Sequence, residues 1–322
     1  MKTSFNLKPI FVTLLFAFSV QGAQANPLGG AVVNGQADIV SSGNTLTVTN
    51  TPGTIINWQD FSIGRNEITR FAQQSASSTV LNRVIGGNPS NILGTLQSNG
   101  QVFLLNPSGI IFGAGATVDV AGLVAGTLNL SNADFLAGRH RYTAVPGAQN
   151  LSNAGNLAAQ SGGQIYLIAP NVENSGIITA PNGEILLAAG HEVELVNGND
   201  PALRVNLTAP AGDATNVGQL VAEAGSLGLF GTVVRNSGTV SADSTTMRGG
   251  KIVFRASQRV EAGGTMSASG TGTPSPQPLS RGERDSGGGT ILLLADMQSG
   301  TVNVSGTLDA SALAQPTPAL PS

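Results

Sequence analysis

The stretch QVFLLNPSGIIFG, residues 101–113, decides how the rest of the chain is interpreted. It contains an apolar run, then Asn106-Pro107-Ser108-Gly109, then a second apolar run that ends at a glycine. The side chain of Asn106 can accept a hydrogen bond from the backbone two residues on. Pro107 presets φ for the second position of a type I turn, and Gly109 suits its last position. The stretch therefore predicts a buried strand, a tight turn and another strand.

The composition favours an all-β protein. The chain of 322 residues contains 43 Gly, 10% charged residues and 4% aromatic residues, and it has no long run of strong helix formers at helical spacing. Gly and Asn tolerate the positive φ values of tight corners, whereas Val, Ile and Thr fit a pleated sheet. We therefore expect many short strands joined by tight turns.

Residues 1–25 have the pattern of a secretory signal peptide. Lys2 and Lys8 precede an apolar segment, and the small residues before Ala25 form a cleavage site that makes Asn26 the first residue of the mature chain. The apolar segment is shorter than the roughly 20 residues that span a bilayer, which disfavours a membrane anchor. The mature chain is therefore expected in the periplasm before any further export.

Charge and cysteine content exclude several classes of function. The formal net charge of −3 becomes more negative when the signal peptide is removed, and Lys251 is then the only lysine. A basic surface for nucleic acid or anionic lipid is therefore not expected. The chain has no cysteine, so its stability has to come from burial and hydrogen bonding. An absence of disulfides would also suit a chain that crosses a second membrane unfolded.

A repeat of about 21 residues runs through the second half of the chain. Its first pattern is glycine, any residue, an apolar residue, any residue and alanine, and it begins at Gly155, Gly176, Gly218, Gly238, Gly264 and Gly306. Its second pattern is glycine, any residue, Ile or Val, any residue and Leu or Phe, and it begins at Gly100, Gly163, Gly183, Gly250 and Gly289. A strand-rich repeat of this length cannot bury its apolar face alone and must stack on its neighbours.

We therefore predict a right-handed single-stranded parallel β-helix, in which each rung adds about 4.8 Å along the axis. The leucine-rich repeat has a similar period, but its asparagine-bearing leucine consensus is absent. Residues 26–83 show no clear period and are expected to form an amino-terminal β cap over an otherwise open end. Trp58, the only tryptophan, is expected in the core.

Two segments do not fit the repeat. Residues 274–285 combine three prolines with four charges, and we interpret them as a loop inserted at a rung corner, because a long surface insertion adds little closure entropy. Residues 311–322 are proline-rich and are expected to form a disordered tail. The β-helix domain is then expected to span residues 26–310.

No catalytic or metal site is predicted. His191-Glu192-Val193-Glu194 lacks the second histidine of a zinc-protease motif and is expected to form the polar outer face of one rung. His140 is expected in an exposed loop. No two acidic residues recur at rung spacing with a basic partner, as β-helix polysaccharide lyases or hydrolases require. We expect no enzyme activity, metal or cofactor, and a polysaccharide-active enzyme is a distant alternative because stacked rungs can bring distant residues together.

The two Asn-Pro motifs resemble those of the amino-terminal secretion domain of two-partner secretion exoproteins, the family of filamentous haemagglutinin and the high-molecular-weight adhesins. The first is Asn88-Pro89-Ser90-Asn91 and the second is Asn106-Pro107-Ser108-Gly109-Ile110, where the family's motif usually reads Asn-Pro-Asn-Gly-Ile. Ser108 replaces the middle asparagine and keeps a turn-compatible residue. The resemblance covers about residues 26–270, is strong over 81–123, and is compositional beyond residue 151.

The resemblance implies a parallel β-helix with an amino-terminal β cap and extra hairpins. It also implies a secretion address on a protein exported through the periplasm to the surface of a Gram-negative bacterium. The address is read by the polypeptide-transport-associated domains of an outer-membrane transporter, and the domain nucleates folding during export of a haemagglutinin-like adhesin. The implied recognition residues are those of the main motif, Asn106, Pro107, Ser108, Gly109 and Ile110, and of the secondary motif, Asn88, Pro89 and Asn91.

Several alternatives stay open at this level. The chain could be a surface adhesin that binds host glycan or host protein directly, or a truncated remnant of a larger adhesin. An autotransporter passenger is disfavoured, because no carboxy-terminal membrane barrel follows the repeats. The turn at Asn106 could be contacted directly by a transporter or could serve only to turn a corner of the helix.

Overall fold

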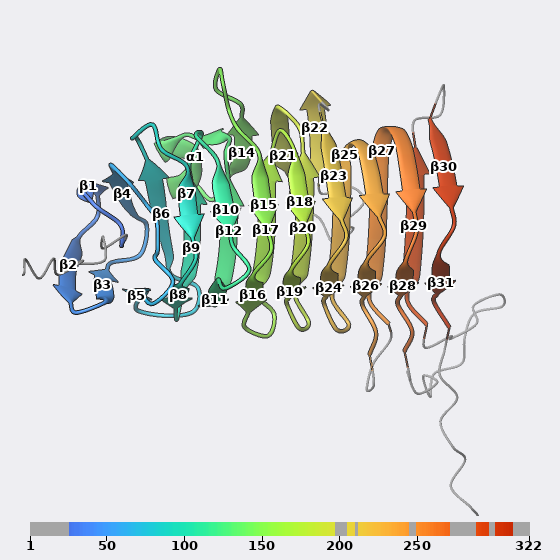
Figure 1. The fold of residues 1–322 in the computed structure, drawn as a ribbon, viewed down its shortest axis with the longest axis horizontal. Coiled ribbons are helices and arrows are strands. Elements are labelled where there is room, and N and C mark those ends of the chain that lie inside the picture. Colours follow the sequence, from blue (N-terminus) through green and yellow to red (C-terminus); the bar gives the residue numbers. More distant parts are fainter. Residues whose placement is uncertain are drawn as a thin grey trace, which may run out of the picture.

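The computed structural model describes residues 26–196, 205–209, 212–244, 249–270, 288–295 and 300–311. These residues form a rod in which 31 strands and one short helix follow one another (Figure 1). The all-β prediction is confirmed. Within the described ranges, no helix has both the length and the apolar character needed to cross a membrane.

The rod has three faces, and the chain visits them in turn. The first face contains β4 (Thr54–Trp58), β6 (Thr79–Val84), β9 (Gln101–Leu105), β12 (Gly122–Gly126), β17 (Gln164–Ala169), β20 (Glu184–Ala189), the first halves of β25 (Ser226–Asn236) and β27 (Lys251–Ala262), and β29 (Thr290–Ala295). The second face contains β7 (Ser90–Ile92), β10 (Ile110–Phe112), β15 (Leu151–Asn153), β18 (Val172–Asn174), β23 (Asp213–Asn216), the second halves of β25 and β27, and β30 (Thr301–Val304).

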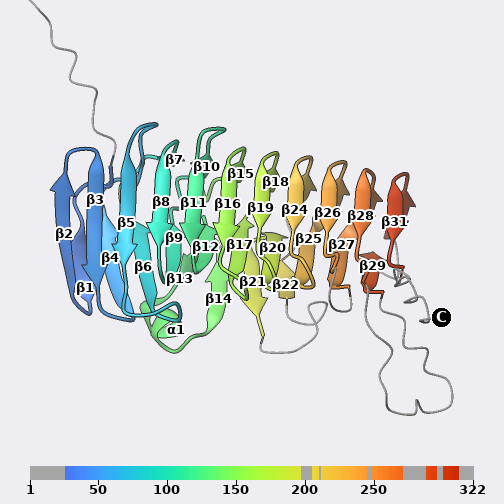
Figure 2. The ribbon, with the colours of Figure 1, turned by 90° about the horizontal axis from the view of Figure 1, so that it is seen from below.

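The third face is an eleven-stranded sheet, and Figure 2 shows its strands side by side along the rod. It contains β2 (Ala37–Ser42), β3 (Thr45–Asn50), β5 (Ile68–Ala72), β8 (Thr95–Ser98), β11 (Thr117–Val120), β16 (Asn156–Ala159), β19 (Ile177–Thr179), β24 (Gln219–Val221), β26 (Thr239–Ser241), β28 (Thr265–Ser267) and β31 (Thr307–Asp309). All its neighbouring strands are parallel except the β2–β3 pair. The predicted parallel β-helix is confirmed, and its winding is the right-handed one that such crossovers favour.

The repeat seen in the sequence places like residues above like residues. The apolar residues of the first pattern form one fully buried column on the third face, Leu157, Ile178, Leu220, Val240 and Met266. The repeated glycines stand at a corner where successive rungs approach closely. A Cβ atom on Gly176 would lie 2.1 Å from the carbonyl oxygen of Gly155, so only glycine fits there.

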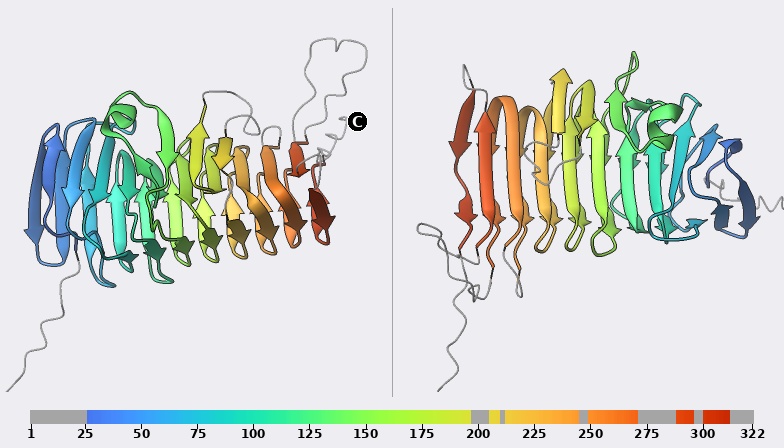
Figure 3. Two further views of the ribbon diagram at one scale, coloured as in Figure 1. Left: turned by 90° about the horizontal axis from the view of Figure 1, so that it is seen from above. Right: turned by 180° about the vertical axis from the view of Figure 1, so that it is seen from behind.

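The first face is buried on both sides, which explains the continuous apolar run in residues 102–105. Val102 and Leu104 point into the β-helix core, whereas Phe103 and Leu105 point outward and are also buried. The outer side is covered by α1 (Asn132–Leu136) and by an antiparallel sheet of β13 (Asn129–Leu130), β14 (His140–Thr143), β21 (Glu192–Leu195) and β22 (Val205–Ala209) (Figure 3). These elements are the extra hairpins that the family resemblance implied.

The amino-terminal end differs from the expected cap in extent. Only β1 (Ala31–Asn34) and β2 pair antiparallel with the rod, with β4 and β3 respectively. Parallel pairing already begins at β3 with β5 and at β4 with β6. The expectation that residues 26–83 form a separate cap was therefore too broad, because the first parallel rungs lack the later glycine spacing. Trp58 is buried, as predicted, and its Nε1 donates to Oδ1 of Asn82 at 2.9 Å.

Both histidine predictions were wrong in placement. His140 lies in β14 rather than in an exposed loop, and its ring stacks on Phe103 with centroids 5.8 Å apart. The segment after His191 forms β21 of the extra sheet rather than the outer face of a rung, with Val193 buried against the first face. Neither position could be inferred from the alternation of polar and apolar residues, because the strands of the extra sheet show the same alternation as the rungs. The predicted signal peptide, the inserted loop at 274–285 and the tail beyond Ser311 lie outside the described residues.

Candidate functional site

The turn between β9 and β10 has the hydrogen bonds that its sequence predicts. The Gly109 N–H donates to the carbonyl oxygen of Asn106 at 3.0 Å, which closes a four-residue turn. The Ser108 N–H donates to Oδ1 of Asn106 at 2.9 Å. Gly109 has φ of +112°, a value that side chains rarely adopt. The turn therefore depends on both its first and its last residue.

The side chain of Asn106 is completely buried, and each of its polar atoms has a partner. Besides the Oδ1 contact within the turn, its Nδ2 donates to the carbonyl oxygen of Asn88 and to Oγ of Ser90, both at 2.9 Å. Asn88 and Ser90 belong to the preceding rung. Asn106 thus connects two rungs through a single amide.

This connection places the two Asn-Pro motifs next to each other in space. β7 and β10 pair in parallel with Ser90 opposite Ile110, so the turn at Asn106 stacks directly on the segment around Pro89. On its other side, the Pro107 carbonyl oxygen accepts from the Gln149 N–H at 2.9 Å. The sequence suggested two related motifs but not that they form one structural unit.

The same corner of the β-helix is built without such a turn in later rungs. Between β17 and β18 only two residues intervene, and in β25 and β27 the strand continues around the corner unbroken. In β25 the bend coincides with a register shift between Gly231 and Val233. Turning the corner therefore does not itself require Asn106 or a proline.

The predicted site residues divide into a buried and an accessible group. Asn106, Gly109 and Ile110 are buried, whereas Pro107 and Ser108 are half-buried. In the secondary motif Asn88, Pro89 and Asn91 are exposed. Ser90, which the sequence reasoning left out of the site, is fully buried and receives the Asn106 amide. An external partner can therefore touch the two prolines, Ser108 and the two exposed asparagines, but not the Asn106 amide.

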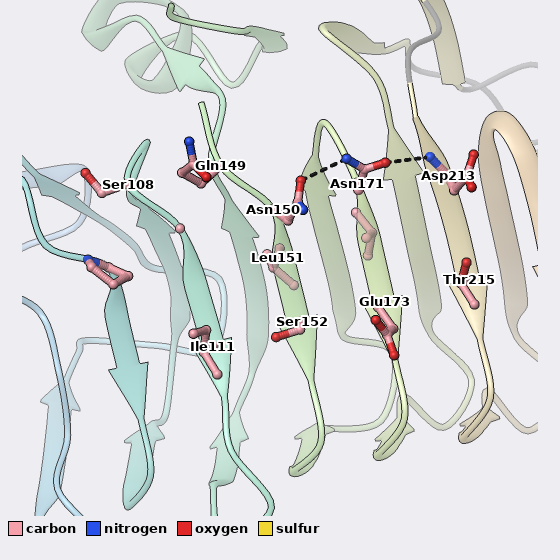
Figure 4. Close-up of a pocket in the computed structure, with 13 residues that line it drawn as sticks. Ser108, Ile111, Gln149, Asn150, Leu151, Ser152, Asn171, Glu173, Asp213 and Thr215 are labelled. Atoms are coloured by element: carbon pink, nitrogen blue, oxygen red, sulfur yellow. Dashed lines mark hydrogen bonds between the residues drawn. The ribbon is translucent and has the colours of Figure 1, made fainter. Parts of the chain in front are cut away.

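A shallow groove of about 530 Å³ begins at this turn and follows the second face. Pro89, Ser108 and Gly109 line one end, and Asp213 and Thr215 line the other. Figure 4 shows two linked amides along its upper rim, in which Asn171 donates to Asn150 at 2.8 Å and accepts from the Asp213 N–H at 2.9 Å. The groove is open and lined by both polar and apolar residues, with Ile111 as an exposed apolar residue on its floor.

The far end of the groove is held by an ion cluster. Arg235 contacts the carboxylates of Asp213 and Glu261, and Arg259 also contacts Glu261, with Nε and Oε1 2.8 Å apart. The hydrogen bond to Asp213 raises the pKa of Arg235, so this side chain stays charged. These side chains are partly exposed, so the cluster contributes little to stability.

A column of buried asparagines is the polar feature that sequence reasoning missed. It runs along the corner between the second and third faces, where each amide nitrogen donates to the Oδ1 of the next rung at 2.7–2.8 Å, through Asn153, Asn174, Asn216 and Asn236. The signal was visible as an asparagine two residues before four of the six repeated glycines, Gly155, Gly176, Gly218 and Gly238. The stacking of these asparagines into a column is not encoded locally, because it depends on how the rungs align.

No arrangement for metal or covalent chemistry is found in the part of the chain that the structure describes. No group of three or more His, Asp or Glu side chains there could hold a metal ion. The His191 side chain lies beside a hollow formed by residues 144–148. The polar groups of the two turns are amides, hydroxyls and backbone atoms, which suit recognition of a partner surface.

The chain is similar to known proteins in sequence and in fold. Residues 23–268 match the family model of the TPS, or two-partner secretion, secretion domain. The fold is similar to the crystal structure of the HMW1 secretion domain from Haemophilus influenzae, with a TM-score of 0.77 and 30% identity over 89% of this chain and 74% of that one.

Two curated relatives are similar over shorter stretches. The chain is 43% identical over 122 residues to a heme/hemopexin-binding protein of Haemophilus influenzae, which covers 38% of this chain and 14% of the relative. A second heme/hemopexin-binding protein of that species is 41% identical over 88 residues, or 10% of its length. The chain therefore spans only a small part of these relatives. On the match of its fold and of residues 23–268, the chain belongs to the family of two-partner secretion domains.

Proposed function

We propose that the two stacked Asn-Pro turns form the address that a cognate outer-membrane transporter reads. The observation that carries this proposal is the contrast at one corner of the helix. Three later rungs pass the corner with a continuous strand, in β25 and β27, or with two residues, between β17 and β18, whereas here a buried amide holds a four-residue turn in place. Because other rungs pass this corner without such a turn, and because Pro107 and Ser108 are accessible, we interpret the turn as a recognition feature rather than as a requirement of the β-helix.

In this proposal the motif residues have separate roles. Asn106, Gly109 and Ile110 position the turn from inside, and Pro107 and Ser108 present it. Asn88, Pro89 and Asn91 extend the accessible surface on the preceding rung. The backbone of the turn is held by hydrogen bonds, so the polypeptide-transport-associated domains could contact the turn without unfolding it.

An export assay tests this division with paired variants. Ser108→Arg and Asn88→Arg place a bulky charge on the accessible surface without removing a hydrogen-bond partner of the Asn106 side chain, because both residues contact it through their backbone. We expect both variants to keep the urea midpoint of the purified chain and to accumulate in the periplasm when expressed with the transporter. Asn156→Arg, at an exposed asparagine of β16 outside the motif, is the matched control and should be exported normally. Normal export of both motif variants would sink direct recognition.

We also propose that the domain nucleates the β-helix as the chain emerges. Asn106 donates to Asn88 and Ser90, which precede it by only 18 and 16 residues. A local closure of this kind does not wait for distant residues. Refolding kinetics provide the test. If the turn forms in the folding nucleus, most of the stability that Asn106→Ala removes should show as a slower folding rate. A change confined to the unfolding rate would contradict nucleation.

The address would act after removal of residues 1–25. Asn26, the first described residue, is almost fully buried, donating to the carbonyl oxygen of Asn44 at 3.1 Å and accepting from Thr69 at 3.0 Å. A mature chain that begins at Asn26 keeps both bonds. Amino-terminal sequencing of the secreted protein should read Asn26-Pro27-Leu28. A start beyond Asn26 would contradict this cleavage site.

Surface adhesion is a second candidate function, favoured by the polar groove along the second face. Its amides and the Glu173 carboxylate could bind hydroxyl-rich host glycan or a polar protein surface. Purified residues 26–322 should then bind host cells, and Glu173→Lys should weaken that binding. Equal binding by Glu173→Lys and the unaltered chain would remove the groove from this role.

A further inference from the structure

The loop between β14 and β15, residues 144–150, lies against the motif turn. The Gln149 N–H donates to the carbonyl oxygen of Pro107 at 2.9 Å, and a Cβ atom on Gly109 would lie 3.4 Å from the Cβ of Gln149. Figure 4 shows the Gln149 side chain next to Ser108. Because Gln149 is exposed, the accessible surface of the two Asn-Pro turns continues onto this loop.

Hydrogen bonds fix the shape of the loop. The Ala148 N–H donates to the carbonyl oxygen of Val145 at 3.1 Å, which closes a turn within the loop. At the other end of the loop, the Ala144 N–H donates to the carbonyl oxygen of His191, just before β21, at 2.7 Å. The loop is therefore held between the motif turn and the extra antiparallel sheet.

A hollow of about 370 Å³ opens between this loop and the start of β21. Residues 144–148 have no polar side chain, and Glu192 supplies a carboxylate at the rim. Glu192 is exposed, and no basic side chain among the described residues forms an ion pair with it. Glu194, two residues further along β21, is already paired with Arg141, with Nη2 and Oε1 2.6 Å apart. The hollow therefore offers one carboxylate that is available to a partner.

We propose that this hollow receives a lysine or arginine side chain from the periplasmic domains of the outer-membrane transporter. The inference rests on the proposed function and extends its recognition surface. The aliphatic stem of such a side chain packs on residues 144–148 while its charged group pairs with Glu192. The chain has a formal net charge of −3, so a basic partner is also complementary at longer range.

The hollow selects among transporters. Residues 144–148 and Glu192 lie outside the stacked rungs, so their sequence can change without altering the winding of the β-helix. The Asn-Pro turns, in contrast, are tied to each other through the buried Asn106 amide. The turns present the address, and the hollow matches it to one transporter.

An export assay with charge reversal tests the hollow. Glu192→Arg places two basic groups against each other, and we expect the exported fraction to fall by about tenfold or more when the chain is expressed with its transporter. Glu192→Gln should cause a smaller loss. Both purified variants should keep the urea midpoint of the unaltered chain, because the side chain is exposed and has no ion-pair partner to lose.

The matched control is Glu223→Arg, which makes the same change in net charge. Glu223 is an exposed acid on the loop between β24 and β25, at a different corner of the rod. This variant should be exported normally. Equal losses from Glu192→Arg and Glu223→Arg would mean that net charge governs export, which would overturn the inference.

Suppressor selection identifies the partner residue. Transporter variants that restore export of Glu192→Arg should replace a lysine or arginine of the periplasmic domains by an acidic or neutral residue. Restoring changes that lie only elsewhere in the transporter would contradict the pairing.

The same assay separates this inference from the proposed function. Normal export of Glu192→Arg, with Ser108→Arg retained in the periplasm, would overturn the role of the hollow and leave the turn address intact. Normal export of both variants would overturn both proposals.

Discussion

One corner of this β-helix, between the first and second faces, is built differently in an early rung and in two late rungs. After β9 the chain makes a four-residue turn held by the buried amide of Asn106. In β25 and β27 a single strand of eleven or twelve residues bends through the same corner. In β25 the hydroxyl of Thr232 is buried there without a hydrogen-bond partner. The early corner is therefore fully bonded, whereas the late one tolerates an unsatisfied group.

The difference separates two kinds of buried asparagine. Asn106 occurs once, donates to the preceding rung, and has a backbone carbonyl and a serine hydroxyl as acceptors. The asparagines of the ladder recur in successive rungs and donate to the following rung. The repeated hydrogen bonds stabilise several rungs along the rod, whereas the Asn106 hydrogen bonds hold a single turn. That turn contains the family motif.

The largest expected effect is the loss of the unique bond. Asn106→Ala removes the acceptor for the Ser108 N–H and the donor to Asn88 and Ser90, all in a buried setting. We expect the free energy of unfolding to fall by about 2–4 kcal/mol in urea titrations of the purified chain.

The matched control lies at the same corner in the later rung. Thr232→Val removes a hydroxyl that has no partner and keeps the shape of the side chain. The free energy of unfolding should then stay within about 0.5 kcal/mol of the unaltered chain or rise slightly. Similar losses in the two variants would mean that the two corners do not differ.

The second-largest loss of stability is expected from the column of buried asparagines. Asn174→Ala leaves the Asn153 amide without its acceptor and the Asn216 carbonyl without its donor. We expect a loss of about 1–3 kcal/mol and faster amide hydrogen exchange in the rungs from β15 to β23. Exchange at the Ser108 amide should stay slow, and its acceleration would argue that the two regions are not independent.

Gly109 tests the backbone of the turn with a smaller change. A Cβ atom there would lie 3.4 Å from the Cβ of Gln149, so space is available, but φ of +112° is unfavourable for alanine. Gly109→Ala should therefore cost about 1–2 kcal/mol through conformation alone. A urea midpoint equal to that of the unaltered chain would mean that the turn relaxes to another shape.

Lowering the pH should affect the rungs around Asp243 more than the turn at Asn106. Burial alone raises the pKa of Asp243, but hydrogen bonds from Ser267, Ser269 and Ser241 outweigh it and lower the pKa below the ordinary value. Its stabilising contribution is then complete above the ordinary carboxyl pKa, about 4, and is lost as the pH falls through the folded value. The Asn106 network contains no titrating group.

Hydrogen exchange at low pH measures this difference. Rungs around β26 and β28 should lose protection before β7 and β10, and Asp243→Asn should make that loss less dependent on pH. Equal loss of protection in both regions would contradict the assignment to Asp243.

The fold could be predicted because its signal repeats. Six glycines at corners and the apolar residues two positions later gave the period, and the turn at Asn106 followed from local chemistry. The partners of Asn106 could not be predicted, since Asn88 and Ser90 become neighbours only when the rungs stack. The extra sheet over Phe103 could not be predicted either, because polar and apolar residues alternate in β14 and β21 as they would in a strand of the β-helix.

The account rests on a single amide that connects two rungs at the motif, and amide hydrogen exchange of residues 26–322 with and without Asn106→Ala tests that connection most directly. We predict that the Ser108 and Gly109 amides, and the Ser90 amide that donates to the Gly109 carbonyl, all lose protection in the variant. The amides of β16 to β19 should keep theirs. Unchanged protection at Ser90 would contradict the connection between the two turns.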